Sequence, residues 1–194
     1  VWYCIACGKP TVNLNEKGNW FFLRHGETDW NAAKRIQGHT DEKAPLNKAG
    51  KAQARAAAEQ LKAYPIDLIL SSDLLRAKET AGIIASELNS EIVLDKGLRE
   101  RHFGVFEGTT KEERLEKNIE EIFLDFLDGK SNNPHEGENL RGFEQRVARE
   151  IEKHKKNHVH KNVVIVTHGG FIRLLTILLK RLENTLQSEI SVKN

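Results

Sequence analysis

The chain has 194 residues and a formal net charge of +2, with acidic and basic side chains interspersed. This length suits one compact domain, and the charge pattern offers no basic stripe for a nucleic acid. No apolar run could cross a bilayer, and residues 1–7 lack the basic flank and cleavage site of a signal peptide. The composition therefore predicts a cytoplasmic protein without a nucleic-acid or membrane partner.

Residues 1–18 form an N-terminal extension that carries a Cys-x-x-Cys motif at Cys4 and Cys7, followed by Gly8. The spacing is half of a zinc knuckle, but a structural zinc needs four ligands and the chain has no other cysteine. Histidines or a second subunit would have to complete the site. A reduced thiol pair and a redox motif are the alternatives, and no thioredoxin-like context surrounds the pair. A structural zinc is thus one interpretation of this extension.

Four apolar runs predict buried strands, and the first and last are followed by His-Gly pairs at His25 and His168. Continuous apolar runs are typical of parallel sheets covered on both faces. Ligands of such sheets bind beyond the carboxyl ends of the strands, so we expect the two histidines to converge across roughly 140 residues of chain. The predicted strands cover residues 20–23, 66–70, 92–94 and 163–166.

Helical patterns occupy the segments between these strands. Asn47 and Asn139 are each expected to cap a helix, and residues 71–73 are expected to cap another. Alternating strands and helices predict an α/β domain, a three-layer sandwich with a mostly parallel central sheet. The predicted helices cover residues 48–63, 74–88, 115–126, 140–151 and 171–179.

Residues 109–139 interrupt this alternation and contain a loop signal, Ser-Asn-Asn-Pro. We expect them to form a small helical cap over the functional site. The alternative is a peripheral helix without a role in substrate choice. The domain is expected to cover residues 19–194, with the cap inserted in it.

Two further charged residues lie near predicted strand ends. Arg76 falls in the first turn of a predicted helix, and Glu100 follows a predicted strand. Taken alone, Arg76 fits a solvated arginine or a carboxylate partner, and Glu100 fits a surface glutamate. Grouped with Arg24, His25 and His168, however, they suit phosphoryl transfer.

The chemistry of that group is specific. Guanidinium groups match phosphate oxygens bidentately. A neutral imidazole at His25 can attack phosphorus and form a covalent intermediate, while Glu100 can protonate the leaving alkoxide and then deprotonate water. Neighbouring arginines should lower the pKa of His25 and keep its nucleophilic form populated. Because fixed cations balance the phosphoryl charge, catalysis should require no cofactor.

Several motifs resemble those of the histidine phosphatase superfamily, also called the phosphoglycerate mutase-like family. The resemblance extends from about residue 20 to about residue 180, and its motifs follow in the expected order. They lie at residues 24–31, 35–38, 45–53, 71–80 and 167–173.

The resemblance also implies roles for individual residues. It makes His25 the phosphorylated nucleophile and Glu100 the acid and base. The implied phosphate holders are Arg24, Arg76 and His168, and the implied secondary contacts are Asn31, Gln37, Gly38 and the backbone of Gly169.

Two segments bear on the branch of the family, and they point in different directions. Residues 35–39 resemble phosphatases, including fructose-2,6-bisphosphatase-like ones, whereas residues 100–104 are close to the Glu-Arg-His-Tyr-Gly of cofactor-dependent mutases. Residues 135–139 depart from the usual Gly-Gly-Glu-Ser. We expect a phosphomonoesterase that hydrolyses small phosphorylated metabolites through a phosphohistidine. A phosphoglycerate mutase is the alternative, a phosphate- or partner-binding module without turnover is a second one, and a homodimer is left open.

Overall fold

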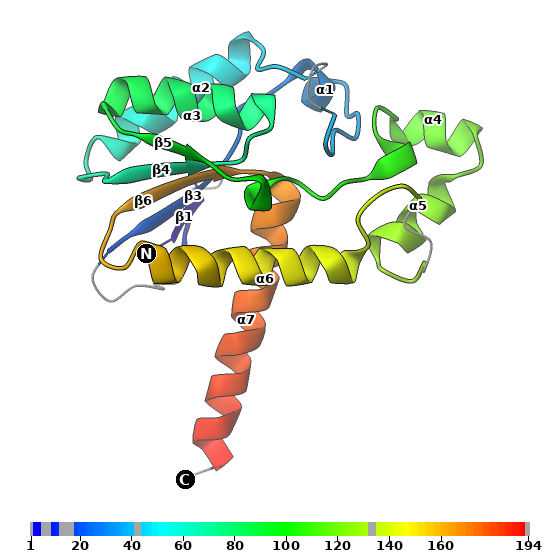
Figure 1. Ribbon diagram of the computed structural model, residues 1–194. Coiled ribbons are helices and arrows are strands. Elements are labelled where there is room, and N and C mark those ends of the chain that lie inside the picture. Colours follow the sequence, from blue (N-terminus) through cyan, green and yellow to red (C-terminus); the bar gives the residue numbers. More distant parts are fainter. Residues whose placement is uncertain (1, 5–8, 12–17, 41–43, 132–134, 193–194) are drawn as a thin grey trace.

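The computed structural model describes residues 2–4, 9–11, 18–40, 44–131 and 135–192 (Figure 1). Its centre is a sheet of four strands in the order β3–β6–β4–β5, and every pairing in this sheet is parallel. The predicted parallel sheet is thereby confirmed. Its strands are β3 (Trp20–Arg24), β4 (Leu68–Ser71), β5 (Ile92–Leu94) and β6 (Val163–Thr167).

The register aligns the carboxyl ends of β3, β6 and β4. Arg24, the last residue of β3, lies opposite Thr167, the last residue of β6. Ser71 at the end of β4 lies opposite Val166. Residues that follow these strands therefore emerge together at one edge of the sheet.

Helices cover both faces of the sheet, which confirms the three-layer architecture. On one face lie α2 (Lys48–Leu61) and α3 (Leu75–Leu88). On the other lie α6 (Leu140–Asn157) and the first part of α7 (Gly169–Val192), as Figure 1 shows.

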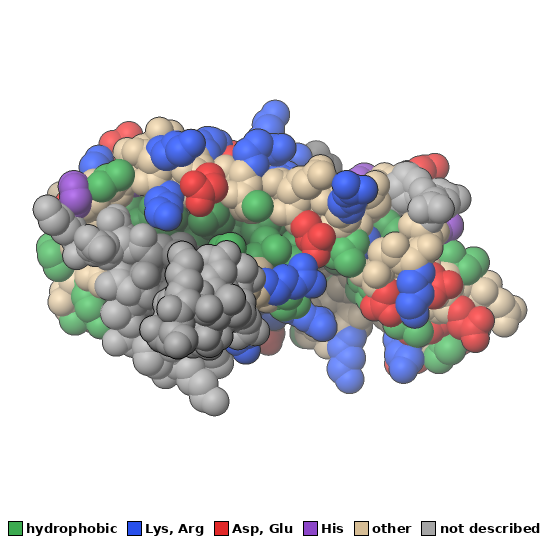
Figure 2. Space-filling view, turned by 90° about the horizontal axis from the view of Figure 1, so that it is seen from below, with side chains coloured by type: hydrophobic (Ala, Val, Ile, Leu, Met, Phe, Trp, Pro, Cys, Tyr) green, Lys and Arg blue, Asp and Glu red, His purple; other side chains and the backbone are tan. Residues whose placement is uncertain are grey.

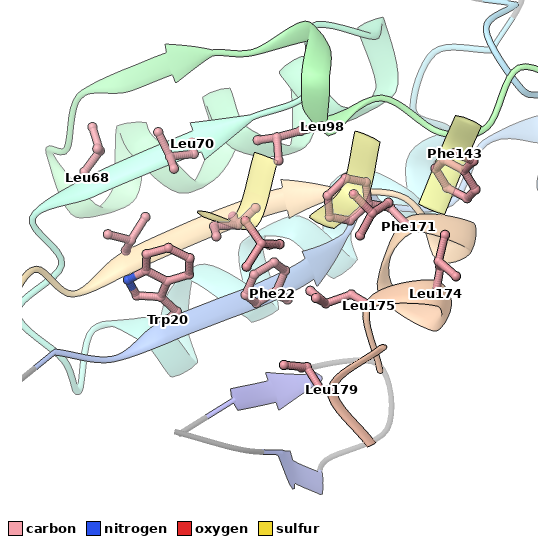
Figure 3. Packing of buried hydrophobic residues seen from close by; sticks show 14 residues of the cluster. Trp20, Phe22, Leu68, Leu70, Leu98, Phe143, Phe171, Leu174, Leu175 and Leu179 are labelled. Carbon is pink, nitrogen blue, oxygen red and sulfur yellow. The ribbon is translucent and has the colours of Figure 1, made fainter. Parts of the chain in front are cut away.

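Alternate residues of β3 anchor the two layers. Phe21 and Leu23 pack with Leu61 and the alanines of α2 and α3. Trp20 and Phe22 point to the opposite face and pack in the cluster that contains Phe171 of α7 (Figure 3). Fully burying a side chain of this size stabilises a fold by about 1.5–3 kcal/mol, so both layers are firmly fixed to the sheet.

Two of the three predicted helix caps are present. The side chain of Asn47 accepts the N–H of Gly50 at 2.9 Å, and that of Asn139 accepts the N–H of Gly142 at 2.7 Å. The cap predicted from residues 71–73 is wrong. The residue at the N-terminus of α3 is Leu74, and no side chain caps it.

The serine and aspartate expected at that cap have other partners. Oγ of Ser72 lies 2.8 Å from Nε2 of His168. The carboxylate of Asp73 accepts two bonds from Arg99, at 2.5 and 2.6 Å. These side chains thus interact across the sheet edge, and Oγ of Ser72 also accepts the N–H of Leu74 at 3.3 Å without capping α3.

The segment after β5 contains two helices where residues 115–126 predicted one. They are α4 (Lys111–Glu116) and α5 (Glu120–Leu127). Asn118, between them, has φ of +55°, and this left-handed conformation ends a helix. Both helices lie beyond the carboxyl ends of the strands (Figure 1), and Phe106, Phe123 and Phe126 form their apolar core.

Arg101 joins α5 to the segment that carries Glu100. Its buried guanidinium donates to the carbonyls of Phe126, Leu127 and Glu138 at 2.7, 3.1 and 2.8 Å. It also lies 4.0 Å from the centroid of the Phe126 ring. The helical segment and the Glu100 loop are thus held as one unit.

Short elements complete the described chain. Near the N-terminus, β1 (Trp2–Cys4) pairs antiparallel with β2 (Lys9–Thr11). Cys7 lies outside the described residues, so the zinc interpretation stays a prediction. The others are α1 (Asp29–Ala32) and the 3₁₀ turns η1 (Lys96–Leu98) and η2 (Gly104–Phe106).

The remaining features are the apolar character of the helices and the distribution of charge on the surface. Among the described residues, no helix combines the length and apolar character required of a membrane span. Figure 2 shows acidic and basic side chains interspersed over the described part of the face opposite α2 and α3.

Candidate active site

His25 follows β3 and is 7% exposed. Its Nδ1 lies 2.8 Å from the carbonyl oxygen of Gly26. A carbonyl can only accept, so Nδ1 carries the ring proton and Nε2 keeps its lone pair. Nε of Arg76 donates to this Nε2 at 3.2 Å. The ring nitrogen that carries the lone pair therefore faces the guanidinium.

The surroundings of His25 hold it in the neutral form. Burial, followed by the positive charge of Arg76, lowers the pKa of His25 to about 3. Arg24 lowers the pKa further, and the hydrogen bond to Gly26 raises it. The predicted direction is confirmed, although burial contributes more than the arginines. The imidazole is neutral at physiological pH.

Arg76 is 1% exposed, so the interpretation of a solvated arginine is wrong. It lies in the first turn of α3, as predicted. Besides its bond to His25, it donates from NH2 to the carbonyl of Gly38 at 2.7 Å and from NH1 to that of Thr40 at 3.3 Å. The guanidinium is thus fixed between the imidazole and the loop of residues 37–40.

His168 follows β6 and is fully buried, with its ring centroid 5.2 Å from that of His25. The predicted convergence of the two histidines is confirmed. Nε2 of His168 pairs with Ser72, whereas Nδ1 has no hydrogen-bond partner within the described part of the chain. Burial, and then the positive charge of Arg76, hold the pKa of His168 well below its usual range.

Glu100 reaches the same sheet edge from the loop after η1. Its Oε2 accepts the N–H of Gly170 in the first turn of α7 at 2.9 Å, and its Oε1 accepts the N–H of Arg101 at 3.0 Å. The side chain is half-buried. The carboxylate therefore binds the backbone of Gly170, which lies two positions after His168 in the chain.

The other predicted phosphate and substrate contacts differ in their exposure and in their hydrogen-bond partners. Arg24 is exposed and lies beside Gly169, where an ideal Cβ would be 3.4 Å from its Nε. Oδ1 of Asn31 accepts the N–H of Thr28 at 3.1 Å. This bond belongs to the capping box of α1, so the oxygen already has a partner. Gln37 is 7% exposed, and its Oε1 has no hydrogen-bond partner among the residues described.

A cavity of about 440 Å³ borders this group on the side of α2. Arg24, His25 and Asn31 contribute to its wall, together with Gln53 and Ala57. Arg76, Glu100 and His168 do not line it. The cavity therefore touches the cluster without enclosing it.

Three residues at the site make contacts that escaped sequence reasoning. Oγ1 of Thr80 accepts the N–H of Gly26 at 3.0 Å and donates to the carbonyl of Arg76 at 2.7 Å. Ser72 orients His168, and Nε2 of His39 lies 2.8 Å from the carbonyl of Glu100. The position of Ser72 just after a predicted strand was the signal that could have identified it.

A second charged cluster lies between η1 and α6. Ligand-type atoms of Asp95, Glu150 and His154 lie within 4.8 Å of one another. The ammonium of Lys153 contacts both carboxylates, so a cation of the chain already balances their charge. We assign no metal to this cluster.

Comparison with known proteins places this geometry in context. A family model described as "Histidine phosphatase superfamily (branch 1)" matches residues 20–194. The chain is 41% identical over 157 residues to phosphoglycerate mutase-like protein 4 of Arabidopsis thaliana, covering 79% of this chain and 67% of that protein.

Two further relatives bear on activity and fold. A metal-independent phosphoserine phosphatase of Arabidopsis thaliana is 38% identical over 158 residues, covering 79% of this chain and 65% of that protein. The solved structure of Bacillus stearothermophilus YhfR matches with a TM-score of 0.76 and 32% identity, covering 84% of this chain and 79% of the other.

Proposed function

This chain belongs to the histidine phosphatase superfamily, and on that premise we propose that it hydrolyses small phosphomonoesters through a phosphohistidine at His25. The observation that carries the proposal is the neutral, buried His25, whose Nε2 faces Arg76 at 3.2 Å. A nucleophile beside a fixed cation is what attack on an anionic phosphoryl group needs.

In the first step, Nε2 of His25 attacks phosphorus and the bond to the ester oxygen breaks. Glu100 enters this step as the carboxylic acid and gives its proton to the departing alkoxide. Arg24, Arg76 and His168 hold the phosphoryl oxygens, with Nδ1 of His168 as the available ring position. The backbone N–H of Gly169, at the start of α7, adds a donor at a positive helix end.

In the second step, Glu100 as carboxylate removes a proton from water while the water oxygen attacks phosphorus. The nitrogen–phosphorus bond breaks, which frees phosphate and restores neutral His25. Asn31, Gln37 and Gly38 are proposed as further substrate contacts. The buried amide of Gln37, whose Oε1 is unpaired among the described residues, supports such a contact.

Two observations favour hydrolysis over phosphoglycerate mutation. A mutase must protect its phosphohistidine from water until the substrate has reoriented, whereas Glu100 is only half-buried. A relative with 38% identity is named a phosphoserine phosphatase. The mutase stays the second candidate because another relative is named mutase-like and residues 100–104 resemble mutases.

We also propose that catalysis needs no metal or cofactor. Arg24 and Arg76 supply fixed positive charge at the site, and a relative is named a metal-independent phosphatase. The proposed zinc at Cys4 and Cys7 would be structural and separate from the reaction.

The deciding experiment is a time course with phosphoserine and with 3-phosphoglycerate, following free phosphate and 2-phosphoglycerate together. We expect net phosphate release without a requirement for 2,3-bisphosphoglycerate. Enzyme denatured and quenched in base should carry an acid-labile, base-stable label that His25→Ala abolishes together with turnover.

Other results of these experiments would support an alternative function or contradict the mechanism. Rapid isomerisation with little free phosphate, accelerated by the bisphosphate, would establish a mutase. Phosphate binding without hydrolysis of any ester would favour a binding module. Full activity in His25→Ala would contradict the mechanism.

A further inference from the structure

The carboxylate of Glu107 joins two loops near the site. Oε1 accepts the backbone N–H groups of His39 at 2.9 Å and of Phe103 at 3.0 Å. Oε2 accepts the backbone N–H of Thr40 at 2.9 Å and its hydroxyl at 2.7 Å. A carboxylate offers about four acceptor positions, so these bonds saturate it. Its side chain is 10% exposed, which keeps the bonds away from competing water.

Glu107 and Arg76 hold opposite sides of one peptide group. The peptide between Gly38 and His39 gives its N–H to Glu107 and its carbonyl to NH2 of Arg76. The carbonyl of Thr40 accepts from NH1 of Arg76. A negative carboxylate, an aligned peptide dipole and a positive guanidinium thus follow one another, an order in which each bond strengthens the next.

The glycine at position 38 reflects the same arrangement. Its φ is +51°, a conformation that favours glycine. An ideal Cβ at Gly38 would also overlap Oε1 of Glu107. The carboxylate therefore occupies the space that any larger residue at this position would need.

We propose that Glu107 is a positioning residue that fixes the guanidinium of Arg76 against Nε2 of His25 by clamping the peptide between Gly38 and His39. The inference deepens the proposed function, since it adds a residue that acts on the nucleophile through Arg76. Glu107 itself touches neither His25 nor the reacting atoms.

The position of Arg76 affects the pKa of His25. The charged groups that face His25 are Arg76 and Arg24, and the titratable ring of His168 also faces it. The imidazoles near Glu107 are His39 and His102. If Arg76 loses its anchor, its charge moves away from Nε2. The pKa of His25 should then rise from about 3 toward its ordinary value of 6.5.

The test is Glu107→Gln, with Glu116→Gln on exposed α4 as the matched control. The pKa of His25 is read from an NMR titration of the imidazole nitrogens in enzyme without substrate. We expect no titration of His25 above pH ~4 in the wild type and the control, and a raised pKa in the variant. Turnover of the variant should fall roughly tenfold or more, because the cation is misplaced.

A second variant tests the clamp more gently. Thr40→Val removes the hydroxyl bond at 2.7 Å and nearly conserves side-chain volume. We expect a smaller rise in the pKa of His25 in this variant, and little further change when it is combined with Glu107→Gln. If Glu107→Gln does not fold, this variant decides the question alone.

An unchanged pKa of His25 in the folded variants would overturn the proposal, even if activity fell, because Glu107 would then serve only the fold. The titration needs no turnover. A failure of the proposed hydrolysis would appear in the phosphate assay and a failure of this inference in the titration.

Discussion

Oε2 of Glu100 accepts the backbone N–H of Gly170 at 2.9 Å, and an ideal Cβ at Gly170 would overlap Oε1 of the same carboxylate. The helix that follows His168 therefore sets the position of the proposed acid and base. The carboxylate is the far end of a flexible side chain, so it can move aside without disturbing the fold.

Gly170→Ala should accordingly impair turnover far more than stability. We expect kcat to fall roughly 10²-fold, a size that a misplacement of about 1 Å can produce. Steady-state kinetics and thermal unfolding measure the two effects. Gly82→Ala, with open space around its Cβ position, is the control. Wild-type kcat in Gly170→Ala would show that Glu100 does not act from this position.

Ser72→Ala should reduce turnover by releasing His168. The hydroxyl 2.8 Å from Nε2 fixes the orientation of a ring that has no other hydrogen-bond partner among the described residues. We expect a cost of about 1 kcal/mol in unfolding free energy and roughly tenfold in kcat. Ser71→Ala, which removes a buried hydroxyl bonded to the backbone of Ser72, is the matched control. Equal kcat in both variants would contradict this role.

Arg101→Met should destabilise the protein without touching the reacting groups directly. The change removes three bonds to carbonyls and leaves those acceptors buried. We expect a loss of about 3 kcal/mol in unfolding free energy by urea titration. A loss below about 1 kcal/mol would mean that water replaces the guanidinium.

The pair of Asp73 and Arg99 should make stability depend on pH. The hydrogen bonds from Arg99 lower the pKa of Asp73 below its ordinary value of 3.8. The stabilisation is present above that ordinary value and is lost as the pH falls through the folded-state pKa. Arg99→Gln should cost about 1 kcal/mol at pH 7 and progressively less below pH ~4, as measured by urea unfolding. A cost that is independent of pH would assign the effect to packing.

Hydrolysis should survive EDTA, because the proposed charge stabilisation comes from Arg24, Arg76 and His168. If the protein holds zinc, the metal should disappear in the Cys4→Ser/Cys7→Ser double variant while turnover is largely kept. Metal analysis alongside phosphate release tests both statements. A metal-dependent rate that persists in the double variant would contradict this separation.

The sheet and the meeting of the histidines were predictable because both depend on local patterns. Continuous apolar runs such as residues 20–23 predict buried parallel strands, and parallel strands bring their carboxyl ends to one edge. Arg76 could be assigned to the site because it lies in the first turn of the helix that follows such a strand.

The errors arose where a distant partner outweighed a local preference. Ser72 and Asp73 have the chemistry of a helix cap but bond to His168 and Arg99, because those partners lie at the same sheet edge. The left-handed Asn118 divides a helix whose apolar spacing is continuous. The clamp made by Glu107 joins segments that lie more than sixty residues apart in the sequence. Hydrophobic periodicity does not predict such a contact.

The alignment of Arg24 with Thr167 has a consequence for how this chain can change. The spacing of His25 and His168 depends on hydrogen bonds between two adjacent strands and not on the length of chain that connects them. Insertions into the intervening loops can therefore leave the two imidazoles in place. A slip of β6 by one residue would move His168 by about 3.3 Å and turn it to the opposite face. The chain thus tolerates changes in the length of its long connections. It tolerates very little change in the register of the ten residues that form β3 and β6.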